Sequence, residues 1–117
     1  MHRFKELEVW KLSRRFCTSI YKITANFPDN EKFGLVSQLR RASISIPSNI
    51  AEGASRRSNK DFYRFLEIAI GSTYEIETQL LIASDLDFIN QKDIDKLLQE
   101  LASIIKMLSK LMLSLRR

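Results

Sequence analysis

Apolar residues recur at intervals of three and four along most of the chain, which is the spacing of one face of an α-helix. The first such segment is expected from about Lys5 to Asn26, where a Pro-Asp-Asn sequence two residues later ends it. The second is expected from about Glu31 to Ala54. There is no alternating pattern long enough to predict a strand.

Two further segments complete the pattern. Ser58 and Asn90 are expected N-caps of the third and fourth helices, since their side-chain oxygens can accept a hydrogen bond from the first helical turn. The third helix is expected to end near Leu86. Similar lengths and short connections favour antiparallel neighbours. We therefore predict an all-α fold, an up-down-up-down antiparallel four-helix bundle that forms one domain over residues 1–117.

The fourth helix has the clearest repeat. Its apolar stripe is widened in every heptad by Leu98, Ile105 and Met112, which is more than the seam of one bundle needs. A wide stripe can be core that is simply well covered, or it can be a surface for association. The pattern alone does not decide between the two.

The second helix contains a proline where its helical pattern continues without a break. Pro47 removes a backbone donor and its ring meets the carbonyl of Ser43, a defect that costs about 3 kcal/mol in an ordinary helix interior. The third helix has a stretch of small residues around Gly71 and Ser72. We expect the small residues of the two helices to face each other, because small side chains allow backbones to approach closely.

Charge is unevenly distributed along this chain, which has 19 basic and 14 acidic residues. Residues 1–28 and residues 40–64 each carry a net charge of +4, whereas residues 65–90 carry −5. Such polarity can attract polyanions, or it can reflect ordinary solvation of helix surfaces. The basic residues that we expect to bind nucleic acid are Arg56, Arg57, Lys60 and Arg64, with Arg40 and Arg41 as further candidates.

The two adjacent arginines leave an alternative open. A buried charge needs a hydrogen-bonded partner, so Arg41 and Asn49 are expected to reach inward toward Glu75. The alternative is that Arg40 and Arg41 line an exposed basic surface. We expect at least one of the two to be structural.

Candidate chemistry for catalysis is sparse. The only histidine is His2, and no sequence motif for a metal site or a phosphate-binding glycine loop is present. We expect no enzymatic activity, no metal and no cofactor. The single cysteine excludes an internal disulfide, and no segment has the signal-peptide or membrane-spanning pattern, so a cytoplasmic location with no membrane association is expected.

Four stretches carry a family resemblance: FKELEVWKLS from Phe4, FPDNEKFGL from Phe27, QLRRASISIPSNIAEG from Gln38 and GSTYEIETQL from Gly71. They resemble the bacterial four-helix-bundle proteins that are encoded by intervening sequences in 23S rRNA genes, also called S23-type. The signature residues that match are Pro47, Asn49, Glu52, Gly53, Gly71, Ser72 and Glu75.

The resemblance implies a homopentamer. It also implies a relation to the accessory proteins of diversity-generating retroelements, which bind nucleic acid and a reverse transcriptase. We therefore expect an oligomeric RNA- or DNA-binding accessory protein that acts through basic patches. The alternative is a homo-oligomeric scaffold for protein interactions without a nucleic-acid role.

Overall fold

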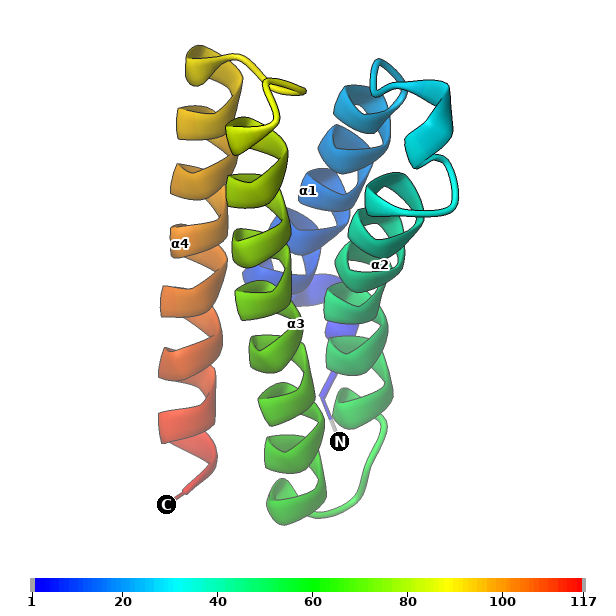
Figure 1. The fold of residues 1–117 in the computed structure, drawn as a ribbon. Coiled ribbons are helices and arrows are strands. Elements are labelled where there is room, and N and C mark those ends of the chain that lie inside the picture. The colour runs from blue at the N-terminus through cyan, green and yellow to red at the C-terminus, as the bar shows by residue number, and fades with distance from the viewer. Residues whose placement is uncertain (1, 117) are drawn as a thin grey trace.

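Four long helices make up most of the computed structural model, which describes residues 2–116 (Figure 1). Short 3-10 turns precede the first and second of them, at Phe4–Glu6 and Asp29–Glu31. No strand is present in this part of the chain. The helices are α1 (Glu8–Thr24), α2 (Leu35–Ala54), α3 (Asn59–Asp85) and α4 (Gln91–Leu115).

Each helix runs antiparallel to the next, which confirms the predicted four-helix bundle (Figure 1). In the described residues, α1 contacts α2 and α4, and α3 also contacts α2 and α4. In the diagonal pairs α1/α3 and α2/α4, no two Cα atoms lie within 8 Å of each other. The bundle measures 45 × 24 × 20 Å, and each helix therefore has one face inward and one face outward. None of the helices within residues 2–116 is both long and apolar enough to cross a bilayer.

The predicted helix boundaries are accurate at the capped ends and less so elsewhere. The Ser58 side chain accepts a hydrogen bond from the backbone N–H of Asp61 at 3.1 Å, and Asn90 accepts one from Asp93 at 2.8 Å, so both N-caps are confirmed. The second helix begins four residues later than predicted. Its N-cap is Gly34, whose φ of −108° and ψ of −114° are not helical.

The core consists of the apolar stripes that the sequence predicts. Side chains that are completely or almost completely buried come from all four helices, and they form a single cluster. The largest of them are Phe16, Ile20, Leu39, Ile46, Ile50, Phe62, Leu66, Ile76, Leu80, Leu101, Ile104 and Leu108.

The contact between α2 and α3 includes the small residues that we expected there. Ser72 donates a hydrogen bond to Ser45 Oγ at 2.9 Å, and Asn49 Nδ2 donates to the Ser45 carbonyl at 2.8 Å. These bonds lie beside Pro47, which is half-buried inside an uninterrupted α2. The Ser72–Ser45 bond joins the two helices close to Pro47, and the Asn49–Ser45 bond lies within α2.

The two signature glycines differ in their surroundings. A Cβ on Gly53 would lie 2.7 Å from Phe65 Cβ and 2.8 Å from Phe62 Cδ1, so α2 needs glycine to approach α3 this closely. A Cβ on Gly71 would meet no atom within 4 Å, and this residue is exposed. The expectation that Gly71 faces α2 is therefore wrong, because its position in α3 places it on the outer surface.

The same substitution at the two glycines should have opposite effects on stability. We expect Gly53→Ala to lower the free energy of unfolding by about 1–3 kcal/mol, because the added methyl overpacks a rigid contact. Gly71→Ala should raise it by about 1 kcal/mol, because alanine favours the helix and nothing obstructs it. Urea denaturation of both variants measures the difference, and a stabilised Gly53→Ala protein would contradict the close packing.

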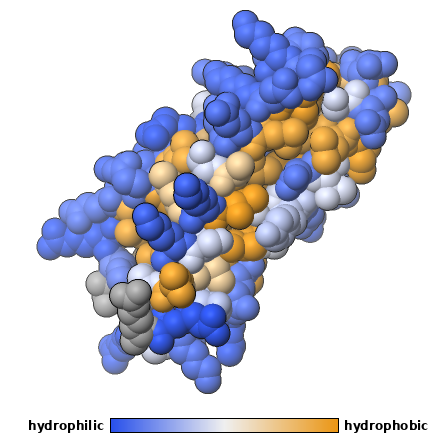
Figure 2. Space-filling model, turned by 90° about the vertical axis from the view of Figure 1, so that its left-hand side faces the viewer, coloured by the Kyte–Doolittle hydropathy of each residue, from blue (hydrophilic) through white to orange (hydrophobic). Residues whose placement is uncertain are grey.

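Most of the wide apolar stripe of α4 packs against the core of the same chain. Leu98, Ile105 and Met112 are half-buried and pack against the core of their own bundle. Figure 2, which looks at the bundle from the side of α4, nevertheless shows apolar atoms exposed in a band along its length. Leu113 and Met107 of α4 are among the exposed apolar side chains. The stripe by itself therefore does not require a partner.

Candidate nucleic-acid interface

The connection between α2 and α3 presents four exposed basic side chains. Arg56 and Arg57 follow the end of α2, and Lys60 and Arg64 lie in the first two turns of α3. Ser58 as N-cap fixes where α3 begins, so the connection is short. The sequence prediction of a basic cluster at this junction therefore agrees with where the structure places these four residues.

Arg56 is the one member of this group with a charged partner. Its Nη2 atom lies 3.2 Å from Glu52 Oε1, and its guanidinium lies over the ring of Phe65 at 4.9 Å. Within residues 2–116, Arg57, Lys60 and Arg64 form no ion pair. A polyanion that contacts these side chains would displace the solvent ions around them.

Both ends of the described chain lie beside this junction (Figure 1). The backbone N–H of His2 donates to the carbonyl of Ala54 at 3.0 Å, and the His2 ring lies 4.9 Å from the ring of Phe62. These contacts bring Arg3 to the same end of the bundle. Arg116 arrives from the end of α4, and it lines a surface hollow together with Lys60 and Tyr63.

We call this surface the basic end. Glu6 and Glu52 pair with two of these cations and Asp61 follows Lys60 in the first turn of α3, so the six cations exceed these three acids by three. All six cations are exposed, and they come from three separate parts of the chain. The basic end comprises Arg3, Arg56, Arg57, Lys60, Arg64 and Arg116.

Arg40 has a structural role instead. Its Nε atom donates to Thr24 Oγ1 at 3.0 Å and its Nη2 atom donates to the Tyr21 carbonyl at 3.2 Å. The guanidinium also lies over the Tyr21 ring at 4.5 Å. Arg40 therefore joins α2 to the end of α1, and Thr24, whose hydroxyl it contacts, is only 2% accessible.

Arg41 and Glu75 are both exposed, and no ion pair joins them. The expected inward contact of Arg41 and Asn49 with Glu75 is therefore wrong. Asn49 binds within its own helix, as described above, because the serine one turn earlier supplies an acceptor at close range. Arg41 lies about 20 Å along α2 from the basic end and does not join it.

These adjacent arginines make a matched pair for a stability test. We expect Arg40→Ala to lower the free energy of unfolding by about 1–3 kcal/mol, because the Thr24 hydroxyl and the Tyr21 carbonyl lose a charged donor. Arg41→Ala should change it by less than about 0.5 kcal/mol, since Arg41 is exposed. Thermal and urea unfolding of the two variants compare these effects, and equal losses would contradict the structural assignment of Arg40.

Comparison with known proteins agrees with this architecture. The sequence model of the family described as 23S rRNA-intervening sequence protein matches residues 5–110. The chain belongs to this family. No curated protein matches it.

A solved structure is similar to this family member. It is the crystal structure, at 1.70 Å resolution, of a protein of unknown function of the S23 ribosomal protein family from Bacteroides thetaiotaomicron. The identity is 26% over 89% of this chain and 97% of the other chain, with a TM-score of 0.80. The similarity supports the bundle fold over nearly the whole length of this 23S rRNA-intervening sequence protein.

Three basic features of this family member, two residues and one surface, were not named as candidates by sequence reasoning. Arg3 and Arg116 join the basic end only through the fold. Their positions near the chain ends could nevertheless have been used as a signal, because an up-down bundle with an even number of helices places both chain ends at the same end of the bundle. The outer face of α1 is the third, and Lys11, Arg14 and Arg15 line a hollow there beside Trp10. Lys11 pairs with Glu8 at 3.3 Å, and Arg14 lies over the Trp10 ring at 5.4 Å.

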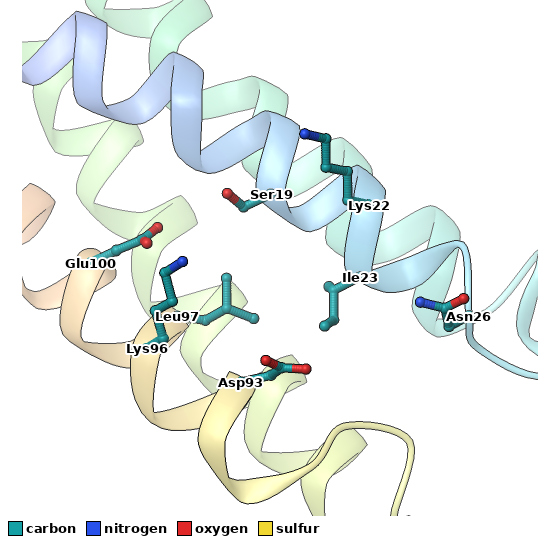
Figure 3. A pocket seen from close by; sticks show the side chains of 8 residues that line it. All are labelled: Ser19, Lys22, Ile23, Asn26, Asp93, Lys96, Leu97 and Glu100. Carbon is teal, nitrogen blue, oxygen red and sulfur yellow. The ribbon is translucent and has the colours of Figure 1, made fainter.

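A further hollow of about 280 Å³ lies between α1 and α4, as Figure 3 shows. Its apolar part is formed by Ile23 and Leu97, one from each helix. Two lysines and two acids surround them, so the hollow has no charge of one sign that would favour a phosphate. Residues 2–116 also contain no group of three or more His, Cys, Asp or Glu side chains that could hold a metal ion. The hollow is lined by Ser19, Lys22, Ile23, Asn26, Asp93, Lys96, Leu97 and Glu100.

Proposed function

We propose that this protein is a non-enzymatic, homo-oligomeric accessory protein of the cytoplasm that binds RNA or DNA through its basic end. The observation that carries the proposal is the convergence of six exposed cations from three parts of the chain. Two of them pair with an acid, Arg3 with Glu6 at 3.5 Å and Arg56 with Glu52 at 3.2 Å, and the other four form no ion pair within residues 2–116. Such a surface recognises phosphates by charge and shape, without base-specific contacts.

The family name is consistent with a nucleic-acid context, since both comparisons refer to ribosomal RNA or ribosomal proteins. Five copies is the number that the sequence resemblance implies. In a closed ring, symmetry would repeat the basic end around one surface, so weak contacts would add on a long polyanion. The same resemblance extends the proposal to a reverse transcriptase as a protein partner.

A scaffold for protein interactions is the second candidate. It is favoured by the exposed apolar side chains, ten of which are large and at least 38% accessible. A surface of this kind is typical of proteins that contact other proteins. In that case, the basic end would serve solubility.

Fluorescence anisotropy with a labelled structured RNA and a labelled DNA duplex distinguishes the two. The nucleic-acid proposal predicts binding at about 50 mM salt that weakens steeply toward 200 mM. The absence of binding to both probes at low salt would overturn it and leave the scaffold function. Binding that does not change with salt would also contradict a phosphate-contacting surface.

A further inference from the structure

The outer face of α3 is unusually apolar for a surface that faces solvent. Of the ten exposed large apolar side chains, four project from this helix, and their accessible fractions are 44–55%. Their spacing places them on one side of the helix, away from the core. They are Ile68, Tyr74, Leu81 and Ile82.

Gly71 lies at the centre of this face. It has Ile68 three residues before it and Tyr74 three residues after it, so the three are neighbours on the helix surface. Glycine weakens a helix interior, and no atom of the chain lies where its side chain would be. Because Gly71 has no side chain, an atom from outside the chain can approach the backbone of α3 closely at this position.

Charges on α3 and α1 are opposite in sign. Beyond Arg64, the remaining charged residues of α3 are all acidic: Glu67, Glu75, Glu77 and Asp85. Beyond Glu8, those of α1 are all basic: Lys11, Arg14, Arg15 and Lys22. Because α1 and α3 are diagonal in the bundle and do not contact each other, their outer faces point in different directions.

We propose that copies of this chain associate head to tail, with the outer face of α3 in one copy against the outer face of α1 in the next. Carboxylates of α3 meet the cations of α1, and the aliphatic stems of Arg14, Arg15 and Lys22 cover the apolar residues around Gly71. Tyr21, which is 39% accessible, adds an aromatic side chain to the α1 face. The inference rests on the homo-oligomer of the proposed function and names the surfaces that form it.

Charge reversal on either face provides the main test. The α3 variant combines Glu67→Lys with Glu75→Lys, and the α1 variant combines Arg14→Glu with Arg15→Glu. All four side chains are exposed, so we expect both variants to keep the helical far-UV dichroism of the wild type. Light scattering should give a multiple of 13.6 kDa for the wild type and about 13.6 kDa for each variant.

Mixing the two variants distinguishes this arrangement from general damage. The basic α3 face of one variant then meets the acidic α1 face of the other, and both unaltered faces also remain complementary. An equimolar mixture should form complexes heavier than 13.6 kDa in which the two chains alternate, as open chains or even-numbered rings, because a ring of five cannot alternate two chains throughout. The matched control is Lys106→Glu with Lys110→Glu, which reverses two exposed charges of α4 and should leave the wild-type mass unchanged.

Gly71→Gln tests the close contact independently of charge. The bundle has room for this side chain, so the variant should unfold at the same or a higher urea concentration than the wild type. A side chain of this length prevents another copy from approaching α3, so the oligomer mass should fall toward 13.6 kDa. An oligomer that survives this substitution would contradict a contact at Gly71.

The outcomes separate this inference from the nucleic-acid proposal. A wild type with a mass of 13.6 kDa at tens of micromolar overturns the head-to-tail contact, whether or not the protein binds RNA. Charge-reversal variants that remain oligomeric also overturn the head-to-tail contact, but they do not contradict nucleic-acid binding by the basic end. A wild-type oligomer supports the contact, even if no RNA binds, when each variant alone is monomeric and the two variants together form mixed complexes heavier than 13.6 kDa.

Discussion

Replacing Arg56, Arg57 and Lys60 together by alanine should lower the affinity for structured RNA by roughly 100-fold at about 50 mM salt. Each of these side chains is exposed and makes no contact that the core requires, so the variant should fold as the wild type does. The loss follows from counterion release, because three phosphate contacts and the ions they displace are removed together. Fluorescence anisotropy at fixed salt measures it.

The matched control removes the same amount of charge from the opposite end of the bundle. Lys32, Lys92 and Lys96 are exposed there, in the α1–α2 connection and in the first two turns of α4. Their combined replacement by alanine should change the RNA affinity by only a few-fold, since distant charges are screened beyond about 10 Å. Equal losses in the two triple variants would mean that net charge, and not the basic end, determines binding.

Leu101→Ala should lower the free energy of unfolding by about 2–5 kcal/mol. Leu101 is 1% accessible and lies in the central cluster, so its truncation leaves a cavity that the neighbouring helices cannot fill without moving. The control is Leu113→Ala in the same helix, where the side chain is 58% accessible and the expected loss is under about 0.5 kcal/mol. Urea denaturation with an unchanged m-value gives both numbers. Equal losses would contradict the assignment of the α4 core stripe.

The sequence was sufficient for the fold because the helical periodicity depends on local spacing and on one apolar face for each helix. The buried residues of α3 and α4 follow the predicted stripes almost without exception. The start of α2 was placed too early because Glu31 is the last residue of a 3-10 turn, and a non-helical Gly34 separates this turn from the helix. Such a change of backbone geometry leaves no trace in hydrophobic periodicity.

The basic end was predicted in part. The cluster at the α2–α3 connection is contiguous in sequence, whereas Arg3 and Arg116 reach it through contacts made by His2 and Tyr63. Arg40 and Arg41 could not be separated from sequence alone, because adjacent residues lie 100° apart on a helix and the position of α1 decides which one is engaged. The wrong prediction for Gly71 has the same cause. Its small size suggested an inward contact, but the sequence does not show which side of α3 faces α2.

The salt dependence of RNA affinity, measured for the wild type and for the Arg56, Arg57 and Lys60 triple variant, tests the central claim most directly. Between about 50 and 200 mM salt, the slope of log affinity against log salt should be smaller in magnitude for the triple variant by about 2 to 3. Equal slopes in two folded proteins would show that these side chains do not contact phosphates, and would contradict the basic end as the nucleic-acid interface.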